Sequence, residues 1–430
     1  MSRHAYRASI FHLLDDPAGR EDAAAYFEDG ALLVEDGHVA EIGRWSEIAP
    51  RLEGAPVDRF PGGLIVPGFV DAHVHFPQVD IIGSPDLSLL QWLSAYAFPA
   101  ESRFHHADVA AEAARFFLDG LLANGTTAAL VFATAHKVSA EALFAEALKR
   151  NMRIVTGKVL MDRNAPAGIS DTAETGYQES RALINTWHGK GRLGYAVTPR
   201  FALTSSNRQL ELAGRLVKDN PGVLLHTHLS ENLEELEAVR RAFPDCADYF
   251  MVYEKYGLAN RHSVFAHCLH LSPDEWARLG KRRCGIAFCP TSNLFLGSGL
   301  FDLKVAETAG ARIGLGTDVG AGTSLSLFAT MNEAFKVCQL KKRPVDALKL
   351  FFLATLGGAR AIGLDGKIGN LAPGKEADFL VLDAAALPLL QRRWAHTKAL
   401  NEKFFALAVL GDDRAVARTY VAGELAHSRE

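Results

Sequence analysis

The feature that most constrains the fold of this chain is an alternation of apolar, β-branched runs with stretches of helical periodicity. Such an alternation is typical of parallel βα units. Eight strand candidates can be counted: Leu64–Val74, Thr126–Phe132, Ile154–Leu160, Leu193–Thr198, Val223–Thr227, Ser263–Ala266, Gly285–Phe288 and Arg312–Gly316. Eight parallel strands close a barrel. The pattern therefore predicts an α/β fold of the (β/α)8, TIM-like barrel type rather than an open doubly wound sheet.

Both ends of the chain predict a small β domain beside the barrel. The first 60 or so residues read as short strands with a hairpin around Asp36-Gly37, and Asp378–Asp383 alternates like a strand again. We therefore expect residues 1–63 and 368–430 to form one β-sandwich. Residues 64–367 would form the barrel, which we expect to be a metal-dependent catalytic domain.

Composition narrows the function classes. Lys plus Arg number 46 and Asp plus Glu 50, a net charge of −4, and no long basic run occurs, so binding of nucleic acid or of a membrane surface is not expected. No stretch of 18 uncharged apolar residues occurs, and the N-terminal residues lack the pattern of a secretion signal. The 5 cysteines contain no CxxC pair. These features favour a reduced, cytoplasmic protein.

The strongest local signal is His73-Val74-His75, at the end of the first barrel strand. Residues two apart on a strand point to the same face, so both imidazoles can converge on one ion. An HxH pair alone is weak evidence, because such pairs also arise by chance. The residues at the ends of the other strands strengthen it.

Further polar residues follow later strands: His228 the fifth, His267 the sixth and Asp318 the eighth. Barrel enzymes build their active sites at this carboxyl end. Under the competing interpretation, each histidine is an ordinary core or loop residue. His226 and His228 also form an HxH pair, and spacing alone does not decide between them. We prefer His228 because it is nearer the strand end.

Imidazole nitrogens with one carboxylate oxygen suit zinc or ferrous iron, and an open coordination position makes such a site catalytic. The metal lowers the pKa of its water from 15.7 towards ~7, and a carboxylate must then accept the proton. Glu231 lies three residues beyond His228 and can serve as that carboxylate. It can also be the acidic start of a helix, and the two roles are compatible. No lysine was found in a bridging position at the end of the third or fourth strand candidate, which favours one metal ion per chain over two.

Several motifs together resemble the metal-dependent amidohydrolase superfamily, in its mononuclear deaminase branch. They are Pro67-Gly68-Phe69-Val70-Asp71-Ala72-His73-Val74-His75, Thr227-His228-Leu229-Ser230-Glu231, Ala266-His267-Cys268, Gly316-Thr317-Asp318 and the closing run from Gly369 to Asp378. Within the branch, further stretches are similar to members that deaminate guanine. They are Phe76-Pro77-Gln78, Leu89-Leu90-Gln91-Trp92-Leu93, Phe98-Pro99-Ala100-Glu101, Thr198-Pro199-Arg200-Phe201 and Cys289-Pro290-Thr291-Ser292-Asn293-Leu294.

The resemblance implies roles for these residues. The zinc ligands would be His73, His75, His228 and Asp318, with iron as the alternative metal. Glu231, Asp318 and His267 would be catalytic: Glu231 would move the proton, Asp318 would orient the water, and His267 would contact the water or the ion. Gln78, Trp92, Arg200 and Phe201 would hold the purine. Hydrolysis would turn guanine into xanthine and ammonia, and the family suggests a homodimer. The roles of His270 and His136 are left open.

Three alternatives are weighed against this interpretation. One is a deaminase of another ring, such as a pterin, triazine or pyrimidine. Another is a cyclic-amide hydrolase with two metals, which the missing bridging lysine disfavours. The third is a metal-free structural or regulatory relative, against which the intact set of candidate ligands argues.

Overall fold

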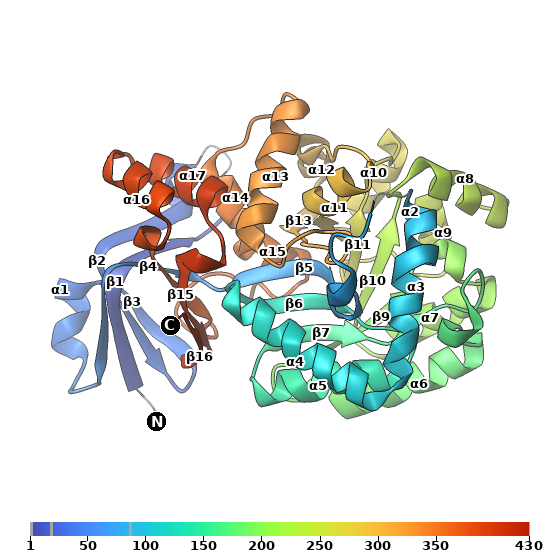
Figure 1. Ribbon diagram of the computed structural model, residues 1–430, viewed down its shortest axis with the longest axis horizontal. Coiled ribbons are helices and arrows are strands. Elements are labelled where there is room, and N and C mark those ends of the chain that lie inside the picture. The colour runs from blue at the N-terminus through green and yellow to red at the C-terminus, as the bar shows by residue number, and fades with distance from the viewer. Residues whose placement is uncertain (1–2, 18–19, 86–87, 430) are drawn as a thin grey trace.

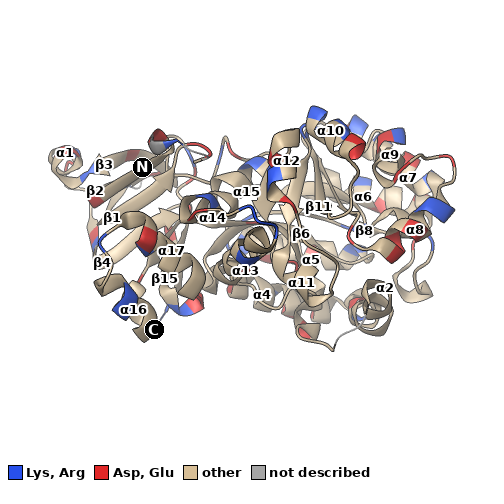
Figure 2. Ribbon diagram, turned by 90° about the horizontal axis from the view of Figure 1, so that it is seen from above, with Lys and Arg blue, Asp and Glu red and all other residues tan. Residues whose placement is uncertain are grey.

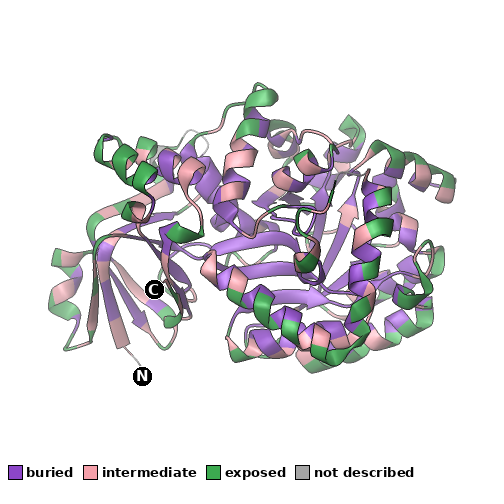
Figure 3. Ribbon diagram, viewed as in Figure 1, coloured by how far each residue is buried: buried purple, intermediate pink, exposed green. Residues whose placement is uncertain are grey.

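The computed structural model describes residues 3–17, 20–85 and 88–429. Two bodies lie side by side in it, a barrel of strands ringed by helices and a separate sheet that contains segments from both ends of the chain (Figure 1). The barrel strands are almost wholly buried, whereas the helices around them expose their outer faces (Figure 3). The core therefore lies within and around the barrel.

Eight parallel strands form the barrel in the order of the chain, which confirms the predicted fold class. They are β5 (Phe69–His75), β6 (Thr126–Phe132), β7 (Arg153–Gly157), β9 (Gly194–Pro199), β10 (Leu224–Leu229), β11 (Ser263–His267), β12 (Gly285–Phe288) and β13 (Arg312–Leu315), and the short β8 (Val159–Leu160) pairs with β9. The segment after β13 meets β5: Asp318 N donates to His73 O at 2.9 Å, and His75 N donates to Val319 O at 2.9 Å. These bonds bring the first and last barrel strands together.

Helices connect the strands on the outside. They are α4 (Ala107–Ala123), α5 (Lys137–Lys149), α6 (Ala173–Trp187), α7 (Asn207–Asp219), α8 (Leu233–Ala242), α9 (Tyr249–Lys255), α10 (Pro273–Lys281), α11 (Pro290–Phe295), α12 (Leu303–Ala309), α13 (Leu327–Leu340), α14 (Ala347–Ala354) and α15 (Leu356–Ala361). The connection from β5 to β6 also carries a helical segment made of α2 (Leu89–Trp92), the π-helical turn η4 (Leu93–Ala97) and α3 (Phe98–Ser102). This segment lies beside the carboxyl ends of the barrel strands (Figure 1), and its residues Leu89, Trp92 and Leu93 line a cavity there.

The second body is a seven-stranded sheet in the order β16-β15-β14-β4-β1-β2-β3. Its strands are β1 (Arg3–Leu13), β2 (Ala24–Glu35), β3 (His38–Arg44), β4 (Val57–Pro67), β14 (Phe379–Leu382), β15 (Val416–Val421) and β16 (Glu424–Ser428). The hairpin between β2 and β3 turns at Asp36 (φ 47°) and Gly37 (φ 79°). Two helices that the sequence did not predict, α16 (Pro388–Ala395) and α17 (Leu400–Leu410), lie between β14 and β15 in the chain.

The strand predicted over Leu64–Val74 is divided between the two bodies. β4 ends at Pro67 in the outer sheet, and β5 begins at Phe69 in the barrel. A Cβ atom on the intervening Gly68 would lie 2.1 Å from Thr127 Oγ1, so only glycine fits where the chain passes from one sheet to the other. The domain boundaries expected at residues 63 and 368 stay a prediction.

Buried ion pairs join the two bodies. Arg192, which precedes β9, contacts Glu376 at 2.6 Å and Asp378 at 2.5 Å. Arg153, at the start of β7, also pairs with Glu376. Elsewhere, basic and acidic residues are interspersed over both bodies (Figure 2). Among the described residues, no helix is both long and apolar enough to span a bilayer.

Candidate active site

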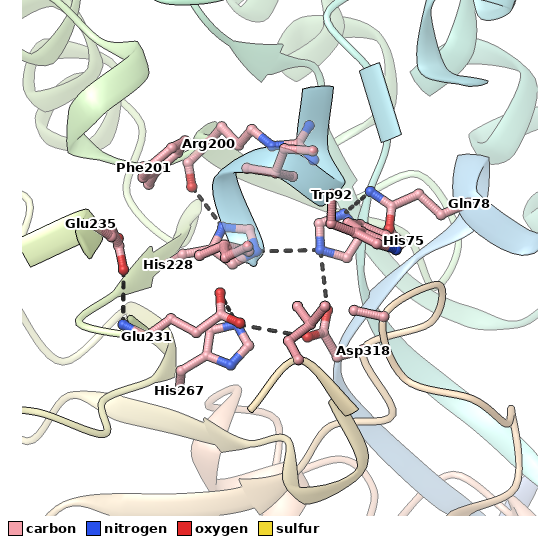
Figure 4. A pocket seen from close by; sticks show the side chains of 14 residues that line it. His75, Gln78, Trp92, Arg200, Phe201, His228, Glu231, Glu235, His267 and Asp318 are labelled. Carbon is pink, nitrogen blue, oxygen red and sulfur yellow. Dashed lines mark hydrogen bonds and ion pairs between the residues drawn. The ribbon is translucent and has the colours of Figure 1, made fainter. Parts of the chain in front are cut away.

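Four of the predicted site residues converge at the carboxyl end of the barrel. His73 and His75 come from β5, His228 from β10, and Asp318 follows β13. Figure 4 shows how His75, His228 and Asp318 lie relative to one another. His75 Nε2 lies 3.2 Å from His73 Nε2 and 3.3 Å from His228 Nε2. Asp318 Oδ1 lies 3.1 Å from His73 Nε2 and 3.3 Å from His75 Nε2. All four groups offer an atom within 4.8 Å of the others.

His228 and His73 each make a hydrogen bond through Nδ1, on the side of the ring away from the cluster. Their Nε2 atoms, which face the cluster, are then free of hydrogen. His228 Nδ1 lies 2.7 Å from the carbonyl oxygen of Arg200, which only accepts, so Nδ1 carries the hydrogen and Nε2 is bare. His73 Nδ1 lies 2.7 Å from His226 Nε2. When His73 donates this hydrogen, its own Nε2 is bare as well. His226 thus lies behind His73, whereas His228 lies in the cluster itself.

The four residues fit a metal ion. In a tetrahedral zinc site with bonds of about 2.0–2.1 Å, neighbouring ligand atoms are roughly 3.4 Å apart, close to the spacings of 3.1–3.3 Å between these atoms. Burial lowers the pKa of His75 to about 4 and that of His228 well below its ordinary value, so both rings are neutral at pH 7. Burial acts to raise the pKa of Asp318, but the neighbouring His73 holds it well below its usual range. Neutral imidazole and ionised carboxylate are the ligand forms of these side chains.

Glu231 and His267 close the other side of the cluster. His267 Nε2 lies 3.4 Å from Glu231 Oε2 and 3.7 Å from Asp318 Oδ2, while its Nδ1 lies 2.8 Å from Asn293 Oδ1. The buried Nε2 has no hydrogen-bond partner among the described residues. His267 therefore presents Nε2 to the carboxyl groups of both Glu231 and Asp318.

The position and protonation of Glu231 are set by its surroundings. Its backbone N–H donates to Glu235 Oε2 at 2.9 Å. The acidic start of α8 consists of Glu234 and Glu235, and Glu231 itself precedes the N-cap residue of this helix. Ser298 Oγ donates to Glu231 Oε1 at 3.1 Å. Burial and the charge of Asp318 raise the pKa of Glu231 to about 8. A carboxyl group with such a pKa can both accept and return a proton near neutral pH.

The backbone is strained where several of these side chains are held. Ser230 (φ 58°), His267 (φ 74°) and Asp318 (φ 51°) all adopt the left-handed region that non-glycine residues rarely enter. Each follows or ends a barrel strand. Strain of this kind concentrates at functional sites, where the surrounding structure enforces it.

His75, His228 and Asp318 of the cluster line the floor of a cavity. Its walls include the four residues that the resemblance assigned to the substrate, namely Gln78, Trp92, Arg200 and Phe201. Leu89 and Leu93 of the inserted helical segment, with Leu296 and Ala321, add apolar surface. The cavity therefore combines an apolar, aromatic lining with a few polar groups, as small-molecule sites commonly do.

Sequence reasoning missed Glu101 as a site residue. Its carboxylate is fully buried and accepts from Gln78 Nε2 at 2.8 Å and from Arg200 Nη1 at 2.6 Å. Glu101 belongs to the motif Phe98-Pro99-Ala100-Glu101, which by itself assigns it no role. The signal available in the sequence is an acidic residue that directly follows the apolar run Ala97-Phe98-Pro99-Ala100.

The expectation that no lysine stands at the end of the third barrel strand is wrong, because Lys158 does. It directly follows β7, the third barrel strand, so a lysine does stand there. Its buried ammonium contacts Asp171 at 2.7 Å and Glu179 at 3.3 Å, and it does not line the cavity. Because its ammonium group points to Asp171 and Glu179, away from the cluster, Lys158 is not placed to bridge two metal ions. One ion per chain stays a prediction.

The two histidines left open lie outside the cluster. His270 Nε2 lies 2.8 Å from the carbonyl oxygen of Ser298, whose hydroxyl contacts Glu231. His136 packs near His105, with ring centres 5.8 Å apart. Neither residue lines the cavity.

This fold and site define a barrel protein with a candidate metal centre at the carboxyl ends of its strands. The sequence profile of the amidohydrolase family matches residues 64–426. The chain belongs to the amidohydrolase family, as its motifs indicated.

Relatives and solved structures of this family are similar over the full chain. The chain is 48% identical over 421 residues to the guanine deaminase of Escherichia coli (strain K12), covering 98% of this chain and 96% of that protein. The structure of E. coli guanine deaminase superimposes with a TM-score of 0.97 at 46% identity, covering 100% of both chains. Guanine deaminase from C. acetobutylicum, with guanine bound in its active site, gives a TM-score of 0.91 at 28% identity, covering 98% of this chain and 99% of that one.

Proposed function

We propose that this protein hydrolyses guanine to xanthine and ammonia at the cavity above the His and Asp cluster, with one zinc ion per chain as its cofactor. One observation carries the proposal: the candidate ligands, a proton-transferring carboxylate and a polar-walled cavity occupy a single site. The similarity to guanine deaminases over the whole chain supports the choice of ring.

The ion would be held by His73, His75, His228 and Asp318. Bound there, it would supply a Lewis acid that makes water a competent nucleophile near pH 7. Three imidazole nitrogens and one carboxylate oxygen at tetrahedral spacing favour zinc, with ferrous iron as the alternative.

The side chains around the centre would direct the water and its protons. Asp318 and His267 orient the water toward the amine-bearing carbon of the ring. Glu231 takes a proton from the water and delivers it to the ring nitrogen beside that carbon. Glu231 then takes the second proton, from the hydroxyl now on that carbon, and gives it to the amine. The C–O bond becomes a carbonyl, the C–N bond to the amine breaks, and ammonia leaves.

The walls would recognise the ring. Arg200 and Gln78 donate hydrogen bonds toward the carbonyl oxygen and ring nitrogens of guanine, and Phe201 or Trp92 contacts its aromatic face. Each buried polar group left unpaired costs about 1–3 kcal/mol, which would disfavour adenine.

An assay of guanine loss and ammonia release, run beside metal analysis of the same sample, tests the proposal. Release of ammonia from guanine by metal-loaded protein is expected. Absence of that release, with ammonia released from a pterin, triazine or pyrimidine instead, would reassign the substrate within the family.

We also propose that the protein is a cytoplasmic homodimer. All five cysteines are free and buried, as expected in a reducing compartment. The dimer rests on the family resemblance, and sedimentation equilibrium of the purified protein tests it: a monomer mass would exclude it.

A further inference from the structure

Glu101 lies on the helical segment that passes over the cavity. A π-helical turn at Leu93–Ala97 precedes α3, and Phe98 and Glu101 lie three residues apart on that helix. Residues at this spacing share a helix face. The guanidinium carbon of Arg200 lies 5.2 Å from the centre of the Phe98 ring, so α3 gives Arg200 both an aromatic face and a carboxylate.

Both oxygens of Glu101 are bonded to groups of the cavity wall. Oε2 accepts from Arg200 Nη1 at 2.6 Å, and Oε1 accepts from Gln78 Nε2 at 2.8 Å. The exposed fractions of Glu101, Arg200 and Gln78 are 0%, 2% and 2%. A buried guanidinium is costly without a counter-charge, and Glu101 supplies it here.

These hydrogen bonds determine which donor groups the cavity wall presents to a ligand. Gln78 Oε1 accepts from Gly320 N at 3.1 Å, and with Nε2 bonded to Glu101 the amide cannot flip without losing both bonds. Among the described residues, the side chain of Arg200 makes no other hydrogen bond, so Nε and Nη2 remain as donors. Gln78 Nε2 also lies 3.4 Å from His75 Nδ1, so the donors of fixed direction that this cavity wall leaves free are chiefly those of Arg200.

We propose that Glu101 is a positioning residue that orients Arg200 and Gln78 and thereby makes the cavity select a purine with a carbonyl oxygen on its six-membered ring. The inference rests on the proposed function. Glu101 itself does not line the cavity, so it acts through the two side chains it holds. A ring without that oxygen leaves the oriented donors unpaired.

The test compares guanine with 2-aminopurine, which keeps the amine on the reacting carbon but lacks the carbonyl oxygen. In Glu101→Gln we expect KM for guanine to rise about 10- to 100-fold with a smaller change in kcat, and the preference for guanine over 2-aminopurine to fall about tenfold. Metal content should equal that of the unsubstituted protein. If 2-aminopurine is not turned over, its inhibition constant against guanine gives the same comparison.

A double-mutant cycle shows whether Glu101 acts through Arg200. Glu101→Gln should cost clearly less in an Arg200→Gln background, because the two residues form one unit. If Glu101→Gln alone does not fold, Glu101→Asp keeps the counter-charge of Arg200 but shortens the side chain, and its preference for guanine over 2-aminopurine should fall as well. Glu275→Gln, in a buried helix cap away from the cavity, is the matched control and should keep the guanine preference.

An unchanged preference in Glu101→Gln, or losses that simply add in the double variant, would overturn the inference. Failure of the unsubstituted protein to act on guanine would instead remove the proposed function, so the two failures are distinguishable.

Discussion

His226 lies directly behind His73, with its Nε2 atom 2.7 Å from His73 Nδ1 and its side chain fully buried. Burial holds the pKa of His226 well below its ordinary value, so the ring is a neutral acceptor at pH 7. It thereby favours the tautomer of His73 whose Nε2 faces the cluster. His226 is not one of the proposed metal ligands, but it can therefore control the tautomer of one of them, His73.

Replacing His226 by Ala should weaken metal binding by about 10- to 100-fold, because His73 loses the acceptor that sets its orientation. Competition with a chromogenic chelator measures this affinity. His226→Gln, which keeps an acceptor, should recover part of the loss, and His136→Ala, outside the cavity, should bind metal normally. Unchanged affinity in His226→Ala would show that His73 needs no partner.

Glu231→Gln should lose at least about 10²-fold in kcat for guanine, since the amide cannot move the proton. Metal content should be retained because Glu231 is not one of the four proposed ligands. Steady-state kinetics and elemental analysis of the same sample measure both quantities. A variant that keeps its kcat would mean that another group transfers the proton.

The stability of the protein should depend on His12 between pH 6.5 and pH 4. Burial lowers the pKa of His12 on β1 to about 4, and its Nδ1 accepts from Leu371 N at 3.3 Å. In this pH range the unfolded chain binds a proton that the folded protein excludes, so the free energy of unfolding falls as the pH is lowered, by roughly 3 kcal/mol in all. The neutral variant His12→Asn should lack this part of the slope in chemical unfolding. Parallel pH profiles for the two proteins would contradict the assignment.

Arg192→Ala should destabilise the fold by roughly 3–5 kcal/mol. The carboxylates of Glu376 and Asp378 would lose the guanidinium group that both of them contact. The midpoint of chemical unfolding measures the effect. Arg208→Ala removes a solvent-exposed ion pair with Glu174 and should leave the midpoint nearly unchanged. Equal effects of the two substitutions would mean that the joint between barrel and sheet is not stabilised by this pair.

Much of the cluster could be predicted because the geometry of parallel β-strands determines which side chains come together. His73 and His75 share a face at period two, and the carboxyl ends of parallel strands meet at one rim, so separate motifs converge there. His226 and His228 show the limit of this reasoning. Both share a face of β10, and only their depth along the barrel decides which one joins the cluster.

Other features depend on contacts that spacing does not encode. The role of Glu101 requires the packing of an inserted helix, interrupted by a π-helical turn, over the cavity. The end of the third barrel strand, where Lys158 stands, is not recognisable from the sequence because the chain is extended on both sides of this residue, in β7 and β8. The division at Gly68 follows from the close approach of Thr127, a residue distant in sequence.

Anomalous X-ray diffraction from crystals of the metal-loaded protein, recorded at the zinc absorption edge, addresses the central claim most directly. We predict one anomalous peak per chain, within bonding distance of Nε2 of His73, His75 and His228 and of a carboxylate oxygen of Asp318. A peak elsewhere, or no peak in crystals of protein that still deaminates guanine after chelation, would contradict the account.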